Sequence, residues 1–281
     1  MFHMNTGFLQ HICRYPLKSA LGERLEQAEI GESGLSGDRR FALIDRESGK
    51  VVSAKRPKLW RSMLLLAAET VPGSGALSVK FPDGREMTSG SSGLVPALSD
   101  FVGRSVDLAS QRRDATMLDR SRPDEVLMSG LDADVTMDVN PLAAETPGTG
   151  FQDLAPIHVV CTATLQAVAA AVHRAELEFH RYRPNFVVMM KDAAPFCEND
   201  WVGRELQMGS VRLKVTRPTP RCAIPTLAHG AGDQFRPAIL EAINRMNRTP
   251  VADLGPLPCI GAYARVVKPG VVGVGDVVEV D

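Results

Sequence analysis

The sequence lacks clustered cysteines. Its five cysteines are odd in number and widely spaced, and no two of them form a C-x-x-C pair: Cys13, Cys161, Cys197, Cys222 and Cys259. A disulfide framework, a structural zinc site or an iron–sulfur cluster needs several thiols close together, so none of the three is expected. Any redox chemistry must therefore rely on a metal and electrons that the chain obtains from elsewhere.

The sequence also lacks a charge excess. Among 281 residues, 32 Lys and Arg stand against 33 Asp and Glu, which gives a net charge of −1. This balance offers no electrostatic case for a nucleic-acid partner, because such partners are bound through an excess of cations. With 44% hydrophobic and 23% charged residues, the composition is typical of an ordinary globular protein.

Long apolar runs are missing as well. The longest stretches, such as residues 63–68 and 157–161, are too short to span a bilayer, and the N-terminus has no basic segment followed by an apolar core. We therefore expect a cytoplasmic protein without a membrane partner. Its length allows one large domain or two modest ones, each with a real core.

Short strand patterns separated by turns dominate the N-terminal part. Residues 40–45 predict a strand that turns back at 47–50 into 51–53. A second hairpin is predicted where the alternating run 77–81 is closed by Pro-Asp-Gly-Arg. Residues 93–102 predict a short helix. From 112 to 149 no period persists, and we expect an irregular connection between two units.

The C-terminal part combines strands with two helices. An apolar strand at 157–161 precedes a helix whose apolar positions are Leu165, Val168, Ala169 and Val172, spaced i, i+3, i+4 and i+7. Hairpin strands are predicted at 205–208 and 211–215, a second helix at 236–247, and closing strands at 263–267 and 277–280. Many strands with few helices predict an α+β, strand-rich and barrel-like fold.

One thiol stands out by its neighbours. Cys222 follows Arg221 directly, and Pro218 and Pro220 restrict the backbone before it. A neighbouring cation favours the thiolate, which is the form that binds a soft metal or acts as a nucleophile. The alternative is a small buried hydrophobic residue, which is what most single cysteines are.

Polar residues that could bind an anion occur in two further places. Thr162 or Thr164 is predicted at the N-terminus of the first C-terminal helix, where free N–H groups and the helix dipole favour negative charge. Arg183 and Asn185 stand at the start of a strand pattern. The alternatives are simple helix capping for the threonines and a surface ion pair for Arg183, as for Arg39.

Six motifs stand in a recognisable order: Tyr15-Pro16-Leu17-Lys18-Ser19, Gly37-Asp38-Arg39-Arg40-Phe41, residues 151–165, Arg183-Pro184-Asn185, Trp201-Val202-Gly203 and Pro220-Arg221-Cys222. Together they resemble the MOSC family of molybdenum-cofactor-binding proteins, which includes relatives of the mitochondrial amidoxime-reducing component. The resemblance covers nearly the whole chain. It implies an N-terminal MOSC β-barrel-like domain at 1–115 and a MOSC β-barrel domain with a few helices at 116–281.

The resemblance also implies a cofactor, molybdenum held by molybdopterin, and not pyridoxal phosphate. Cys222 would be the metal ligand and, with Arg221, a catalytic residue. The residues expected to bind the cofactor are Lys18, Ser19, Arg39, Thr162, Thr164, Arg183, Asn185 and Arg221. Cations and hydroxyls suit the phosphate of molybdopterin, Asn185 suits the pterin edge, and a thiol suits the metal.

The implied activity is the reduction of N-hydroxylated small molecules by two-electron removal of oxygen. An external donor would supply the electrons, namely a ferredoxin-like protein, a flavoprotein or a cytochrome b5-like reductase. Residues 223–229 depart from the Thr-Thr-Val-Asp run of the amidoxime-reducing relatives. Two alternatives therefore stay open: a carrier of the cofactor or of sulfur as a persulfide, and an enzyme that cleaves C–S bonds or transfers sulfur.

Overall fold

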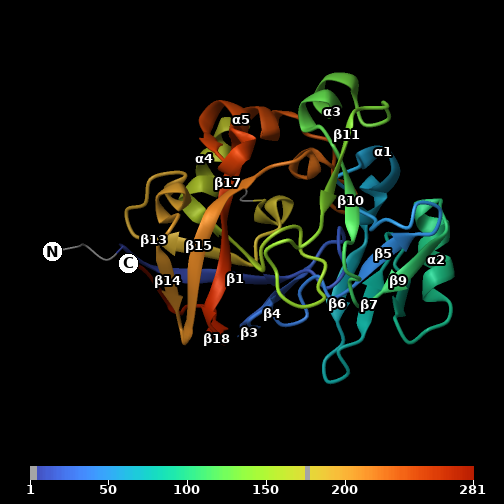
Figure 1. Cartoon of the computed structure of the whole chain (residues 1–281), viewed down its shortest axis with the longest axis horizontal. Coiled ribbons are helices and arrows are strands. Elements are labelled where there is room, and N and C mark those ends of the chain that lie inside the picture. The colour runs from blue at the N-terminus through green and yellow to red at the C-terminus, as the bar shows by residue number, and fades with distance from the viewer. Residues whose placement is uncertain (1–4, 175–177) are drawn as a thin grey trace.

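The computed structural model describes residues 5–174 and 178–281, and its largest element is a closed barrel of seven strands (Figure 1). In order around the ring they are β12 (Ile157–Cys161), β13 (Phe186–Met190), β1 (Asn5–Arg14), β19 (Val277–Val280), β14 (Glu205–Met208), β15 (Val211–Pro220) and β17 (Pro256–Lys268). β17 pairs again with β12, and this pairing closes the barrel. The expected strand-rich α+β fold is confirmed.

Alternating side chains fill the barrel. In β15, Val211, Leu213 and Val215 are buried, while Arg212 between them is exposed, because successive side chains of a strand point to opposite faces. β12 is buried along its whole length. Its outer face is covered by the helices α4 (Thr162–Ala171) and α5 (Ala238–Met246), which share a hydrophobic core with it. Both helices confirm the predicted ones.

The first strand of the chain belongs to the barrel of the C-terminal half. β1 pairs with β13 on one side and with β19 on the other, and β2 (Glu23–Leu25) extends it. Figure 1 shows this blue strand running beneath the orange and red ones. A Cβ on Gly7 would lie 2.1 Å from the carbonyl oxygen of Met189, so only glycine allows this approach. The expected units 1–115 and 116–281 therefore share a sheet.

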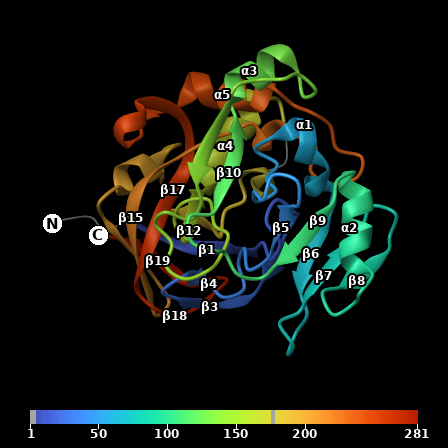
Figure 2. The ribbon, with the colours of Figure 1, turned by 45° about the vertical axis from the view of Figure 1, so that its right-hand side comes forward.

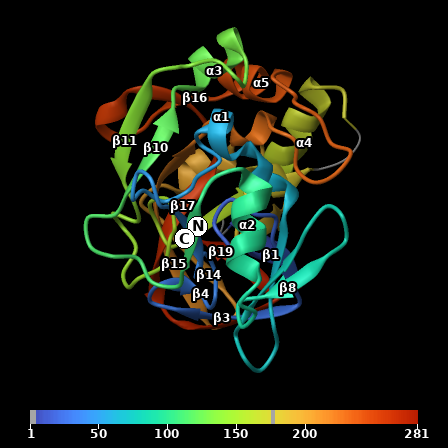
Figure 3. The ribbon, with the colours of Figure 1, turned by 90° about the vertical axis from the view of Figure 1, so that its right-hand side faces the viewer.

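Most of the remaining N-terminal half consists of small sheets and helices around a second core, whereas residues 27–35 pack into the barrel core (Figure 3). The strands are β3 (Gln27–Gly31) and β4 (Gly34–Leu35), which join β18 (Gly270–Gly273); β5 (Ala42–Asp45), which pairs with β9 (Val106–Ala109); and β6 (Ala67–Thr70), β7 (Leu77–Lys80) and β8 (Glu86–Thr88). The helical segments are α1 (Pro57–Trp60), η1 (Arg61–Leu65) and α2 (Leu94–Val102). The β7–β8 hairpin and α2 confirm two predictions.

The predicted hairpin of residues 40–53 forms, but its second arm is short. Asp45 N–H donates to the Lys50 carbonyl, Val52 N–H donates to the Leu43 carbonyl, and Val51 meets Ile44 in an isolated bridge, while the other edge of β5 pairs with β9. The carboxylate of Asp45 accepts hydrogen bonds from Ser48 and Arg104. These bonds fold residues 45–49 into a tight turn, and Val51 then bonds to Met117.

The irregular connection expected at 112–149 contains regular structure. β10 (Met117–Ser121) and β11 (Met137–Pro141) form an antiparallel pair, with α3 (Pro123–Ser129) between them. Only Val126 of α3 is buried, so no apolar stripe reveals the helix in the sequence. In Figures 1 and 2 this green unit lies between the two halves of the molecule. No helix in the described part of the chain is long and apolar enough to cross a membrane.

Candidate functional site

One pocket collects residues from both halves and from the β10–β11 hairpin. Its walls include Lys18 and Arg39 from the N-terminal half, Arg120 from β10, and Arg183 and Cys222 from the C-terminal half. The lining carries seven Lys and Arg side chains: Lys18, Arg39, Lys55, Arg120, Arg183, Arg217 and Arg221. Among the described lining residues, Asp153 is the one carboxylate. The pocket therefore suits an anionic ligand.

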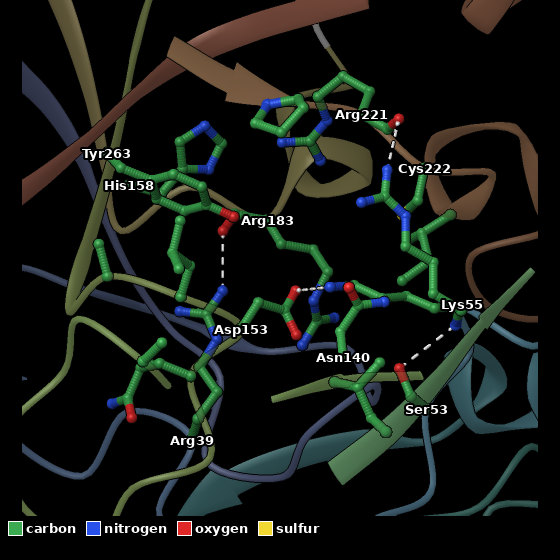
Figure 4. Close-up of a pocket in the computed structure, with 18 of the residues that line it drawn as sticks. Arg39, Ser53, Lys55, Asn140, Asp153, His158, Arg183, Arg221, Cys222 and Tyr263 are labelled. Carbon is green, nitrogen blue, oxygen red and sulfur yellow. Dashed lines mark hydrogen bonds and ion pairs between the residues drawn. The ribbon is translucent and has the colours of Figure 1, made fainter. Parts of the chain in front are cut away.

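Asp153 is shared by two lysines. Its oxygens lie 2.6 Å from Lys18 Nζ and 3.0 Å from Lys55 Nζ, and Figure 4 shows it centrally among the labelled side chains. Burial alone would raise the pKa of Asp153, but the two ammonium groups hold it well below its usual range. Burial lowers the pKa of Lys18 to about 8, although Asp153 acts in the opposite direction.

Two arginines face the same aromatic ring. The guanidinium carbons of Arg39 and Arg183 lie 4.5 and 4.4 Å from the ring centroid of Tyr15. Arg39 pairs with Asp38 and also donates to the carbonyl of Arg183. Among the described side chains Arg183 has no ion-pair partner, and burial together with the charge of Arg39 lowers its pKa to about 10. The surface ion pair considered for Arg183 is therefore absent from this part of the structure.

Ser19 and Asn185 line the pocket, and their side chains form hydrogen bonds with backbone groups of the pocket wall. Ser19 Oγ accepts a hydrogen bond from the Ala54 amide at 3.0 Å. The oxygen of the Asn185 side chain accepts from the His158 amide at 3.1 Å, and its nitrogen donates to the Cys13 carbonyl. Both side chains therefore hold neighbouring wall segments in place, and contact with a pterin stays a prediction for Asn185.

Cys222 lies just beyond the end of β15. The backbone of Arg221 bonds to the Pro258 carbonyl at 2.8 Å, and its guanidinium donates to the Tyr182 carbonyl at 3.0 Å. Cys222 is buried at 6% exposure and lines the pocket beside Arg221. Among the described residues, no group of three or more His, Cys, Asp and Glu could hold a metal ion.

The structure does not bring Thr162 and Thr164 to this pocket. Thr164 is fully buried, and its hydroxyl donates to Glu198 at 2.6 Å and accepts from the Phe196 amide. Glu198 also accepts from the amide of Cys161, which is the N-cap of α4. An internal carboxylate thus takes the anion position at this helix N-terminus. Burial raises the pKa of Glu198 to about 7.

Several residues that line the pocket could not be recognised as binding residues from the sequence alone. Lys55, Arg120 and Arg217 lie outside the family motifs, and no local pattern marks them. Arg217 forms an ion pair with Glu145. Asp153 lies within the motif of residues 151–165, and its place beside Lys18 depends on a contact across 135 positions.

His158 and Tyr263 complete the wall between β12 and β17. Nε2 of His158 lies 3.2 Å from the carbonyl oxygen of Ile260, and burial with the charge of Arg221 lowers the His158 pKa to about 3. Gly261 makes room for this ring, because a Cβ there would lie 2.5 Å from Nε2 and its φ is +71°. Burial raises the pKa of Tyr263 above its usual range. Both rings are therefore uncharged near neutral pH.

Known proteins align with nearly the whole chain. Human mitochondrial amidoxime-reducing component 1 is 25% identical over 296 residues, and mitochondrial amidoxime reducing component 2 of Macaca fascicularis is 27% identical over 291 residues. Each alignment covers 96% of this chain and 82% of the relative. Among solved structures, the YUAD protein from Bacillus subtilis aligns over 100% of this chain and 98% of its own, with 12% identity and a TM-score of 0.45.

Two domain families match successive parts of the sequence. The MOSC N-terminal beta barrel domain matches residues 6–115, and the MOSC domain matches residues 148–279. Between them lie β10, α3 and β11, which supply one wall of the pocket. Together the two matches cover most of the chain, which therefore belongs to the MOSC family.

Proposed function

We propose that this protein is a molybdenum-cofactor-dependent oxidoreductase that removes the oxygen atom from N-hydroxylated compounds. The observation that carries the proposal is the position of Cys222, a single thiol in the wall of a pocket lined by seven cations. In one cavity, the thiol suits the metal end of a metal-bearing phosphate ester, and the cationic side chains suit its phosphate end. The names of the amidoxime-reducing relatives support the reaction class.

The pocket residues fit molybdopterin. Lys18, Arg39 and Arg183 would hold its phosphate, and Cys222 would bind the molybdenum. Two buried wall atoms, Nε of Arg221 and Oε1 of Gln152, have no hydrogen-bond partner among the residues that the structure describes. Buried polar atoms normally have partners, so these two are available to a polar ligand. When bound, the cofactor supplies the two-electron change that the reaction requires.

The reaction breaks the N–O bond of the substrate. The substrate takes up two electrons and two protons, and the products are the reduced nitrogen compound and water. Tyr263 keeps its proton because burial raises its pKa, so its phenol can donate a hydrogen bond in the pocket. Burial of Cys222 limits the access of water to the thiol.

The electrons must be supplied again on every turnover, because cleavage of the N–O bond consumes two of them. We include in the proposal an external donor of the ferredoxin-like, flavoprotein or cytochrome b5-like type. Measuring the rate of substrate turnover with each donor in turn identifies the donor that reduces the enzyme.

The test is metal and pterin analysis of protein from a molybdate-supplied host, together with reduction of benzamidoxime by an artificial reductant. Molybdenum and pterin are expected at about one per chain, and Cys222→Ser should abolish turnover. Cys259→Ser is the matched control, since Cys259 is a buried cysteine that does not line the pocket. Full activity of Cys222→Ser would refute the assignment of the metal ligand.

The same preparation separates the enzyme from the carrier hypothesis. A carrier would release its cofactor readily to an apo-enzyme and would reduce no N-hydroxylated compound. An enzyme would retain the cofactor through repeated turnovers.

A further inference from the structure

The β10–β11 hairpin places a cation beside the thiol. Leu118, Arg120, Asn140 and Pro141 of this hairpin line the pocket. Asp138 stands opposite Arg120 in the strand register, but its ion pair is with Arg122. Arg120 instead donates to the carbonyl oxygen of Arg221 at 3.4 Å, one residue before Cys222.

The charge on this side of the pocket is not balanced by the chain. Arg217 has Glu145 as its ion-pair partner. Neither Arg120 nor Arg221 has an ion-pair partner among the described side chains. The one contact between them joins the Arg120 guanidinium to the backbone carbonyl of Arg221. An anion bound in the pocket would offset the positive charge that these two guanidiniums bring to it.

This group is separate from the one assigned to the cofactor phosphate. Lys18 is anchored on Asp153 and the Phe151 carbonyl, and Arg39 and Arg183 are anchored on Tyr15. In Figure 4, Arg39 and Cys222 lie at opposite ends of the view. The Arg120 guanidinium is therefore available to a second anionic group on the Cys222 side of the pocket.

Apolar side chains line the same pocket as Arg120. Leu118, Ile224, Val251 and Leu254 line the same pocket, and Leu254 is 65% exposed although it is apolar. Ligand sites of this kind combine apolar walls with a few polar groups that fix orientation. The expected occupant has an apolar body and one carboxylate, the planar anion that the arginine fork binds through two hydrogen bonds.

We propose that Arg120 binds a carboxylate of the substrate, so that the enzyme prefers N-hydroxylated compounds with a carboxylate on an apolar body. This inference rests on the proposed function. Arg120 thus acts as a specificity residue supplied by the segment between the two matched domains.

The test compares 4-carboxybenzamidoxime with benzamidoxime on the cofactor-loaded enzyme. The wild type should show a higher kcat/KM for the carboxylated substrate. Arg120→Gln should reduce that preference by about 10- to 100-fold, mainly through KM, because one charged hydrogen bond contributes about 1.5–3 kcal/mol. Arg120→Lys should restore part of it. The control is Arg122→Gln on the same hairpin, whose side chain is 54% exposed.

A second readout does not depend on turnover. Isothermal titration of the oxidised enzyme with the reaction product 4-carboxybenzamidine should show weaker binding to Arg120→Gln than to wild type and to Arg122→Gln. Equal preference for the two substrates in wild type, or unchanged binding to Arg120→Gln, would overturn the inference. The inference would also be overturned if the extracted cofactor carries a nucleotide and Arg120→Gln fails to retain that cofactor, because Arg120 would then bind the cofactor and not the substrate.

The two proposals can fail independently. If neither substrate is reduced, the proposed function fails, whereas Arg120-dependent binding of 4-carboxybenzamidine would still support the carboxylate site. If both substrates are reduced with equal kcat/KM, only the inference about Arg120 fails.

Discussion

At the scale of single residues, the pocket wall contains three residues other than glycine with positive φ angles. Ser19, Arg39 and Arg183 have φ values of +66°, +46° and +55°. Residues other than glycine seldom adopt this left-handed region, and each such residue costs about 1–3 kcal/mol. Three of them in one pocket indicate that the surrounding structure holds these side chains in set directions, as anion binding by fixed donors requires.

Lys18 gives the pocket a pH dependence. Its ammonium loses a proton near pH 8, because burial lowers its pKa to about 8 from 10.5. Anion affinity should therefore fall as the pH rises above about 8, by at most about tenfold per pH unit for linkage to one proton. Calorimetric titration of cofactor-free protein with inorganic phosphate measures this.

Matched variants isolate the lysine. Lys18→Gln should bind phosphate weakly and with little pH dependence, and circular dichroism checks its fold. Lys58→Gln removes a more exposed lysine that pairs with Asp134, and it should keep the wild-type profile. A wild-type affinity that stays constant between about pH 7.5 and 9.5 would contradict the assignment.

At the scale of elements, the segment that follows Cys222 is held by one buried arginine. Arg181, in η2 (Phe179–Tyr182), is 0% exposed and donates to the Leu227 carbonyl at 2.8 Å. It also pairs with Asp233 at 2.5 Å and Glu178 at 3.2 Å. A single side chain thus joins η2 to the segment 223–233, which also contains η4 (Ile224–Thr226).

Removing that side chain should loosen the segment. Arg181→Met removes one partner from Glu178 and Asp233, which keep Arg236, and it takes the donor from the buried Leu227 carbonyl. A loss of about 1–3 kcal/mol in unfolding free energy is expected. Hydrogen exchange of residues 223–233 should increase as well. Arg174→Met removes a more exposed arginine that pairs with Glu178, and its cost should be below about 1 kcal/mol. Similar losses in both variants would contradict this role.

The elements also show which features the sequence could predict. α2 and α5 carry regular apolar faces, and the 77–85 hairpin has typical turn residues. Local sequence patterns are therefore sufficient to predict these three elements. Neither the β10–β11 hairpin nor the role of Glu198 has such a pattern. Glu198 reaches Thr164 across 34 positions, and contacts of this kind depend on the tertiary fold. The family motifs indicated Lys18, Arg39, Arg183 and Cys222, whereas Lys55 and Arg120 lie outside them.

At the scale of the whole molecule, the two matched domains depend on each other. β1 comes from the N-terminal match, yet it stands between β13 and β19 of the C-terminal one. Without β1, both neighbours would become open edges, which promote aggregation. The pocket likewise takes its walls from both halves.

A fragment of residues 116–281 should therefore fail to fold alone. Size-exclusion chromatography and thermal unfolding by circular dichroism should show aggregates without a cooperative transition, in contrast to the full chain. Adding residues 1–14 through a flexible linker should recover part of the folded material. A monomeric fragment with cooperative unfolding would show that the barrel does not need β1.

The pairing of Asn5 with Val280 has a consequence for synthesis on the ribosome. The N-terminal strand leaves the exit tunnel early, but one of its two partners is β19, which is made some 270 residues later. Until then β1 is a strand without that neighbour, so closure of the barrel must follow translation of residues 277–280. Chaperones that bind nascent chains would therefore meet this strand without its β19 neighbour while the residues between the two strands are made.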